Sequence, residues 1–144
     1  MKSIDLNKIL IIFLTIPLFC VFCFTGCDKD SQHPVPEVYV DFKINLELPS
    51  NHKLTNVNGR EYYTGGYKGI IIYRLSEEEF RAFDRACTYN ISERIISEDP
   101  PIAECEDCES SYLLLDGSVV EGPAKHHLKE YRVVFEYPFV YVSN

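Results

Sequence analysis

The chain has 144 residues, of which 46% are apolar, and a formal net charge of -8. This length is enough for one small domain and excludes a multidomain protein. The aromatic content of 13% favours a folded core over a disordered chain. The acidic balance disfavours nucleic acid as a partner, because negative charges repel phosphate.

The chain opens with an apolar segment. Lys2 and Lys8 precede an apolar run of sixteen residues, 9–24. At ~1.5 Å per residue such a run spans about 24 Å, which is shorter than a bilayer core of ~30 Å. A charged start, an apolar centre and an end in small residues predict a secretory signal peptide over residues 1–26. Cys27 follows directly and resembles the cysteine of a bacterial lipobox, which implies cleavage before it and lipidation of its sulfur.

A short uncleaved anchor is the alternative, and both interpretations place the rest of the chain outside the cytoplasm on a membrane. Residues 27–36 are predicted to be the lipidated cysteine and a tether, which Pro34 and Pro36 stiffen. The domain is predicted to span residues 37–144. We expect a protein of the bacterial cell envelope that is anchored to a membrane by lipid on Cys27, with the outer membrane and the cell surface both open.

The first part of the domain is typical of antiparallel strands. Residues 37–48 alternate apolar and polar side chains, which predicts a half-buried strand. A polar segment with proline and glycine predicts a loop over residues 49–60. Further short strands are predicted at residues 62–64, 69–75 and 80–86, with one helical turn at 76–79.

The C-terminal third continues the same pattern. Strands are predicted at residues 112–115, 119–120, 131–137 and 139–142, with a tight turn at 116–118. No segment keeps a helical period for three turns. The sequence therefore predicts a small antiparallel all-β domain, either a sandwich or an open barrel.

Three cysteines remain for the domain. Cys20 and Cys23 lie in the leader, and Cys27 is assigned to lipid; those left are Cys87, Cys105 and Cys108. An odd number allows one internal disulfide and one free thiol, or a metal site. In an exported protein the default is a disulfide. A bond between Cys87 and Cys105 would close a loop of about 18 residues and contribute roughly 3 kcal/mol in the chain-entropy model.

The order of features around these cysteines resembles the Rieske iron–sulfur domain. That family has C-x-H, a spacer, C-x-x-H-G-S-x-[FY], a D-G turn and G-P-A-x-x-P-L-x-x-Y. The resemblance covers roughly residues 67–135. The segments that carry it are Cys87-Thr88-Tyr89, Cys105-Glu106-Asp107-Cys108, Glu109-Ser110-Ser111-Tyr112, Asp116-Gly117, Gly122-Pro123-Ala124, Leu128 and Tyr131.

The resemblance implies a Rieske-like fold with altered ligands. A Rieske cluster takes two thiolates on one iron and two imidazoles on the other. Cys87 and Cys105 match the thiolates, whereas Tyr89 and Cys108 stand at the positions of the imidazoles. Glu109 stands where the family has a glycine in the loop. The resemblance therefore implies a degenerate cluster site.

Three hypotheses follow for the function. The first is a binding or structural role without a cofactor, in which a disulfide joins Cys87 to Cys105 or Cys108. The second is an electron carrier with a 2Fe–2S cluster on the three cysteines and one further group. The third is a zinc-stabilised binding module, with His126 or His127 as the fourth ligand. Both metal hypotheses need all three thiols reduced, whereas the first needs two of them oxidised.

Catalysis is disfavoured by the surroundings of the C-x-x-C pair. Four acidic residues flank Cys105 and Cys108, and negative charge raises the pKa of a thiol. These residues are Glu104, Glu106, Asp107 and Glu109. Hydrolase, metalloprotease and phosphate-loop motifs are absent from the sequence. The sequence therefore favours a role other than catalysis and leaves open whether the chain is an enzyme.

Three tyrosines surround a pair of glycines early in the domain. Tyr62, Tyr63 and Tyr67 lie on either side of Gly65-Gly66. Tyrosine is common in strands, so structure alone can account for these residues. The alternative is an exposed aromatic patch that binds a glycan or a protein. The partners expected for the chain are thus the membrane and an unknown protein, glycan or redox partner.

Overall fold

The computed structural model describes residues 32–144, and residues 33–144 form one compact unit. The predicted signal peptide and the lipidation of Cys27 lie outside the described residues. No helix in the described part of the chain is long and apolar enough to cross a membrane.

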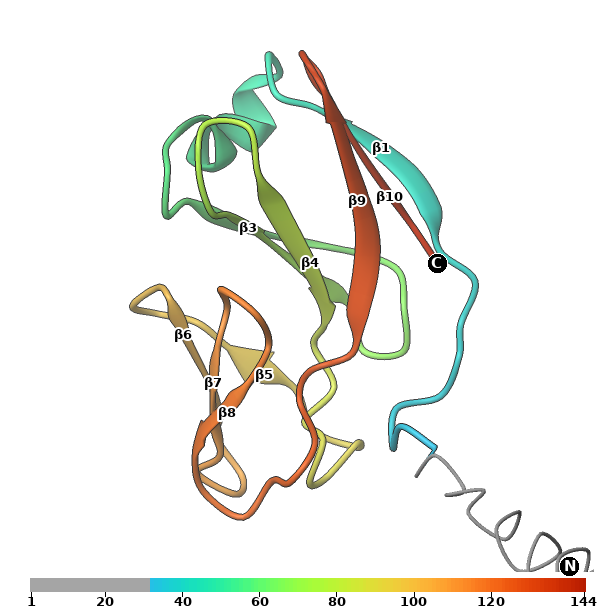
Figure 1. The fold of residues 1–144 in the computed structure, drawn as a ribbon, viewed down its shortest axis with the longest axis vertical. Coiled ribbons are helices and arrows are strands. Elements are labelled where there is room, and N and C mark those ends of the chain that lie inside the picture. The colour runs from blue at the N-terminus through green and yellow to red at the C-terminus, as the bar shows by residue number, and fades with distance from the viewer. Residues whose placement is uncertain (1–31) are drawn as a thin grey trace, which may run out of the picture. The chain divides into compact units, whose positions relative to one another are not determined.

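Ten strands and one short 3-10 helix make up this unit (Figure 1). They are β1 (Asp41–Asn45), η2 (Pro49–Thr55), β2 (Arg60–Tyr63), β3 (Ile70–Arg74), β4 (Phe80–Asp84), β5 (Ile95–Ile96), β6 (Ile102–Cys105), β7 (Ser111–Leu113), β8 (Val119–Glu121), β9 (Glu130–Glu136) and β10 (Phe139–Ser143). The larger sheet has the order β1-β10-β9-β4-β3-β2, and the smaller has the order β5-β6-β7-β8. All neighbouring strands are antiparallel. The predicted all-β antiparallel fold is confirmed.

Several elements differ in detail from those predicted. The first strand is shorter than residues 37–48, although Val40, Ile44 and Leu46 of its apolar face are buried as expected. The predicted loop contains η2, which begins at a proline whose fixed φ suits a helix start. Residues 76–79 form a hairpin turn instead of a helical turn, because the N–H of Leu75 donates to the carbonyl of Glu79 at 2.8 Å.

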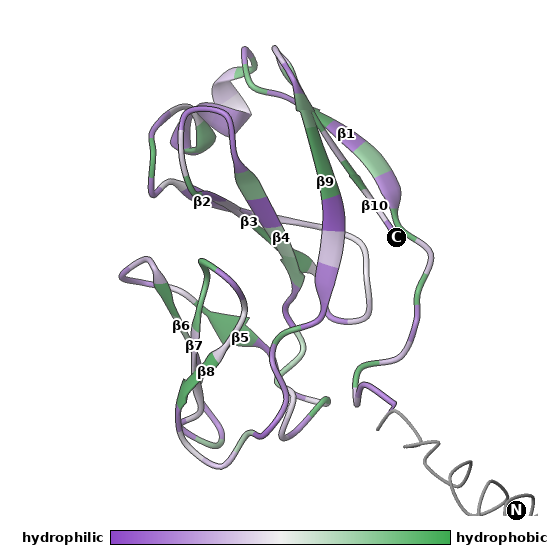
Figure 2. Ribbon diagram, in the orientation of Figure 1, coloured by the Kyte–Doolittle hydropathy of each residue, from purple (hydrophilic) through white to green (hydrophobic). Residues whose placement is uncertain are grey.

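β3 lies between two separate apolar cores. Ile70 and Ile72 pack into a core formed within the larger sheet, whereas Ile71 and Tyr73 pack into a core shared with the smaller sheet. Because side chains alternate along a strand, each face of β3 has its own partner. This explains why three isoleucines, Ile70–Ile72, follow one another in this strand, whose residues Figure 2 colours by hydropathy.

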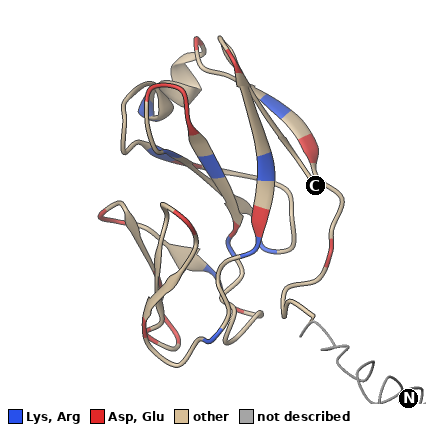
Figure 3. Cartoon of the chain, in the orientation of Figure 1, with Lys and Arg blue, Asp and Glu red and all other residues tan. Residues whose placement is uncertain are grey.

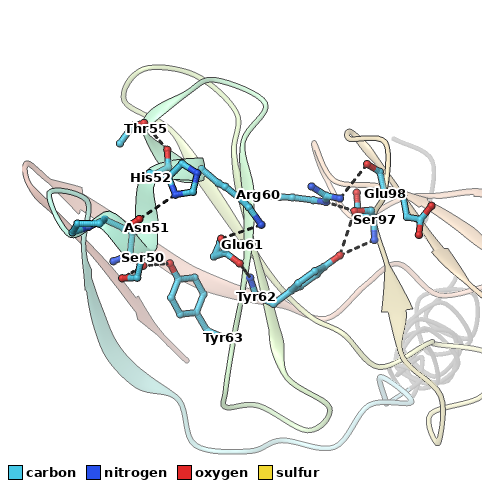
Figure 4. A network of polar contacts seen from close by, with 12 residues as sticks. Ser50, Asn51, His52, Thr55, Arg60, Glu61, Tyr62, Tyr63, Ser97 and Glu98 are labelled. Atoms are coloured by element: carbon cyan, nitrogen blue, oxygen red, sulfur yellow. Dashed lines mark hydrogen bonds and ion pairs between the residues drawn. The ribbon is translucent and has the colours of Figure 1, made fainter.

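A polar network joins the edge of the larger sheet to the smaller one (Figure 4). The hydroxyl of Tyr62 on β2 accepts from the backbone N–H of Ser97, just after β5, at 2.9 Å. The Nε of Arg60 donates to the carbonyl of Ser97, and its Nη2 donates to that of Glu98 at 3.0 Å. These contacts fix the segment after β5 against β2, although β2 and β5 are both short.

Residues at the start of the compact unit contact the loop before β9. Val35 is 2% exposed. The ammonium of Lys129 donates to the carbonyl of Pro36 at 3.2 Å and pairs with the carboxylate of Glu37 at 2.6 Å. His33 accompanies them, with its ring 5.3 Å from that of His127. Part of the segment that the sequence assigns to the tether therefore packs on the domain.

Candidate functional site

The three cysteines of the domain meet at one end of the smaller sheet. Cys87 follows β4, Cys105 ends β6, and Cys108 lies in the turn before β7. Their sulfur atoms all lie within 4.8 Å of one another, and those of Cys87 and Cys108 are 3.4 Å apart. Cys87 and Cys105 are buried, whereas Cys108 is partly exposed. The fold thus builds a compact three-sulfur group that opens to the surface at Cys108.

All three cysteines are free thiols, and the described residues contain no disulfide. The predicted disulfide of Cys87 with Cys105 or Cys108 therefore has no support from this structure. The distance of 3.4 Å between the Cys87 and Cys108 sulfurs is a non-bonded contact. It also shows that three reduced sulfurs can share one site.

Hydrogen-bond donors converge on the Cys87 sulfur. Burial alone would raise the pKa of this thiol, but donors from the backbone of Asn90 and the side chains of Cys105 and Tyr112 lower it below its ordinary value. The Tyr112 hydroxyl lies 3.6 Å from the sulfur. Donors aimed at a buried sulfur favour its thiolate form, which is the form that binds metal.

Cys105 behaves in the opposite way. Burial and its hydrogen bond with the Cys87 thiol raise the pKa of Cys105 to about 12. The pair therefore shares its protons unequally, with Cys87 as the stronger acid. A bound cation would remove this difference, because a metal ion deprotonates the thiols that it coordinates.

Tyr112 is the most important residue whose role the sequence analysis did not assign. It is fully buried, and its hydroxyl accepts from the backbone N–H of Thr88 at 3.1 Å and lies 3.0 Å from the Thr88 hydroxyl. The Thr88 hydroxyl in turn donates to the carbonyl of His126 at 2.6 Å. The aromatic position that ends the second Rieske-like motif was the signal that marked this residue in the sequence.

Ser110 joins the turn that carries Cys108 to the loop after β8. Its hydroxyl lies 3.1 Å from the Cys108 sulfur and accepts from the backbone N–H of Ala124 at 3.1 Å. Gly122 makes this approach possible, because a side chain there would lie 2.9 Å from the carbonyl oxygen of Glu109. The loop after β8 therefore packs against the turn that carries Cys108.

Glu109 has a backbone conformation that favours glycine. Its φ is +57°, in the left-handed region. The resemblance places a family glycine at this position, and the structure shows that the turn still needs the glycine-like conformation. The side chain of Glu109 is exposed, so it does not fill the sulfur site.

The other predicted ligands lie apart from the sulfur group. The Tyr89 side chain is 61% exposed. The ring of His126 lies 6.3 Å from that of His33, and the Nδ1 of His127 lies 2.7 Å from the carbonyl of Leu128. Within the described residues, no histidine nitrogen or carboxylate joins the three sulfurs.

The surface around this site is acidic. Residues 86–128 contain nine acidic and two basic residues, so almost all of the net charge of -8 lies in this part of the chain (Figure 3). Glu98, Glu104 and Glu121 are among the residues that line a groove of about 640 Å³ beside Cys105. This groove distinguishes the smaller sheet from the larger one, whose charges nearly balance.

Solved structures share this architecture. A chain in the complex of reduced oxygenase and oxidised ferredoxin of carbazole 1,9a-dioxygenase superposes with a TM-score of 0.54 and 19% identity, over 72% of this chain and 93% of that one. A chain from a complex of ferredoxin with a substituted oxygenase of carbazole 1,9a-dioxygenase superposes with a TM-score of 0.51 and 12% identity. This match covers 71% of the present chain and 28% of that one. The domain has a Rieske-like fold. No family model matches the chain, and no curated protein matches its sequence.

The residues present do not fit a standard Rieske cluster. That cluster needs two imidazoles on its second iron. Tyr89 is largely exposed to solvent, and a cysteine, Cys108, stands in place of the second imidazole, with its sulfur 3.4 Å from that of Cys87. The Rieske-like fold is therefore present with a different set of donor atoms.

Proposed function

We propose that this chain is an envelope lipoprotein whose Rieske-like domain binds one metal ion through Cys87, Cys105 and Cys108. The observation that carries the proposal is the compact group of three reduced sulfurs. Thiolates about 2.3 Å from a tetrahedral zinc ion lie about 3.8 Å apart. The distance of 3.4 Å between the Cys87 and Cys108 sulfurs is close to this value.

Zinc fits this donor set better than a standard cluster does. Three thiolates with one further ligand form a common tetrahedral zinc site. The donors around Cys87 would stabilise a bound thiolate, and the Tyr112 hydroxyl and the backbone of Asn90 are the groups that provide them. With three sulfurs from the described residues, the fourth position is left to solvent or to a small ligand, and Cys108 lies on the exposed side.

The ion would act mainly as a structural element. It would join the segment after β4 to the turn between β6 and β7, beside strands of only two to four residues. Metal binding contributes directly to folding where the apo site is poorly ordered. The module would then present its acidic surface from a membrane, to which lipid on Cys27 would anchor it.

The experiment is metal analysis of the full chain purified in detergent without chelators. We expect one zinc per chain and no visible colour. Cys105→Ser should lose the zinc, whereas Cys27→Ser, which removes the proposed lipidation site and none of the three sulfurs, should keep it. Cobalt loading should give sulfur-to-cobalt charge-transfer absorption in the parent chain and not in Cys105→Ser. A metal-free chain with a Cys87–Cys108 disulfide would refute the proposal and favour the cofactor-free structural role.

An electron carrier is the second candidate, and the fold favours it. The superposition on a complex that contains a ferredoxin is the observation in its support. An iron–sulfur cluster on Cys87, Cys105, Cys108 and one further group would supply one-electron chemistry, and the partner would be a redox protein. Anaerobic purification tests this candidate: a red-brown chain with two irons and two acid-labile sulfides would establish it and exclude zinc.

A further inference from the structure

A groove of about 470 Å³ lies at the open edge of the larger sheet, away from the cysteines. The turn between β2 and β3 forms one wall, and the segment around β5 forms the other. Tyr62 and Tyr67 expose 36% and 38% of their side chains at this place. Three basic residues also line the groove, namely Lys68, Arg85 and Arg94.

The groove is positively charged although the chain is acidic. No acidic residue lines it. None of its three cations forms an ion pair within residues 32–144, where the four ion pairs involve other cations. Ala86 and Arg94 form an isolated antiparallel bridge, which brings Arg94 next to Arg85. Burial and the nearby Arg94 both lower the pKa of Arg85, so the two arginines repel each other.

Arg85 is held in place before any ligand arrives. Its guanidinium lies over the Tyr62 ring at 4.0 Å, and its Nε donates to the carbonyl of Ile95 at 3.2 Å. The Tyr62 hydroxyl is fixed in turn by Ser97, as Figure 4 shows. The terminal nitrogens of Arg85 make no hydrogen bond within the described part of the chain, so they remain as donors in a fixed direction.

The opposite wall is equally rigid. The buried carboxylate of Asp84 accepts from the backbone N–H groups of Tyr67 and Lys68 and from the Tyr131 hydroxyl at 2.8 Å. Gly66 has a φ of +61°, and a side chain there would clash with Asp84 and Tyr131. The Asp84 charge is therefore satisfied beneath the turn, and the turn presents Tyr67 and Lys68 in a defined arrangement.

We propose that this groove binds an acidic sugar, with the carboxylate on Arg85 and Arg94 and the sugar ring against Tyr67. Paired guanidinium groups match a planar carboxylate, and Lys68 adds a further positive charge. A tyrosine ring offers an apolar surface with a polar end, which suits a ring that carries hydroxyl groups. The volume is within the range of small-ligand sites. This inference does not depend on the metal site.

The test is calorimetric titration of the full chain in detergent with a trimer of galacturonic acid. We expect binding that weakens with added salt, because the groove acts through charge. Lys68→Gln with Arg94→Gln should reduce the affinity about tenfold or more. The matched control is Lys125→Gln with Arg132→Gln, which removes the same charge outside the groove and should leave the affinity unchanged. Equal melting temperatures of both double variants exclude misfolding.

Four outcomes would overturn the proposal. The trimer fails to bind, or both double variants lose affinity equally, which would mean that only net charge matters. Maltotriose, which is neutral, binds as tightly as the acidic trimer, which would remove the role of the arginines. Inorganic phosphate binds as tightly as the trimer, which would show a site for a bare anion without any recognition of the sugar ring.

Discussion

Replacement of Tyr112 by phenylalanine removes one buried hydroxyl at the centre of the cysteine site. The Tyr112 ring is fully buried and would stay in place. The lost oxygen accepts from the backbone N–H of Thr88 at 3.1 Å and lies 3.6 Å from the Cys87 sulfur. Thr88 is 5% exposed, so its N–H would lose its partner without access to water.

The expected cost follows from this unpaired donor. A buried polar group left without a hydrogen bond costs about 1–3 kcal/mol. We therefore expect Tyr112→Phe to lower the free energy of unfolding by about 2 kcal/mol in urea. Because the Cys87 thiolate also loses a donor, zinc affinity should fall by about tenfold. Tyr141→Phe on β10 is the control, since its ring is 38% exposed, and it should change neither quantity.

If Tyr112→Phe lowers the free energy of unfolding by less than about 0.5 kcal/mol and leaves zinc affinity unchanged, this reasoning is refuted. Such a result would show that the Thr88 N–H finds another partner and that Tyr112 only fills space. A loss of stability without a loss of zinc affinity would separate the two roles and leave the backbone of Asn90 as the donor that matters for the metal-bound Cys87 thiolate.

Three further predictions follow from the backbone and the surface. Gly122→Ala should destabilise the fold by about 2 kcal/mol or more in urea and lower zinc affinity, because its φ is +93° and the new methyl group would press on the turn that carries Glu109. Glu109→Gly should stabilise by about 0.5 kcal/mol, since it relieves a φ of +57°, whereas Glu106→Gly in the same turn should destabilise. The pKa of Glu37 is lowered by its hydrogen bond and ion pair with Lys129. The ion pair therefore stabilises the fold fully above the ordinary glutamate pKa of about 4.3, and this stabilisation is lost as the pH falls through the lowered pKa of Glu37. Because Glu37 is largely exposed, the effect should be about 0.5 kcal/mol, and urea unfolding of Glu37→Gln between pH 3 and 6 should lack it.

The larger sheet could be predicted from the sequence because its strands carry their own signal. The strand around Ile44 alternates with period two, and residues 70–73 form a buried run that packs on both faces. β5 and β6 could not be predicted, since a strand of two isoleucines and a strand of four residues that ends at Cys105 are too short to show a period. Tertiary contacts stabilise these strands: the N–H of Ile95 donates to the carbonyl of Arg85, and the Ser97 hydroxyl donates to that of Ile102.

The sequence predicted which residues form the candidate site, but it did not predict how their side chains are arranged. The spacing of Cys87, Cys105 and Cys108 marked the right residues. Only the fold shows that Cys108 lies next to Cys87, twenty-one positions away, at 3.4 Å. The predicted patch of three tyrosines is also only partly formed. Tyr62 and Tyr67 are exposed in the groove, whereas the Tyr63 hydroxyl donates to Asn51 and its ring packs on the core of the larger sheet.

The acidity of the thiols shows which of two opposing effects is stronger. The sequence predicts that the flanking carboxylates raise the thiol pKa values, yet Glu104 and Glu106 are exposed. Charges in water at such positions act weakly, at about 1 kcal/mol or less. Hydrogen bonds to a buried charged sulfur contribute about 1.5–3 kcal/mol each. At Cys87 the effect that opposes the donors is burial, and the donors outweigh it, so the pKa of this thiol is lowered. At Cys105 burial is the leading cause of the raised pKa, so a cation rather than a base is the agent that would complete the deprotonation of this site.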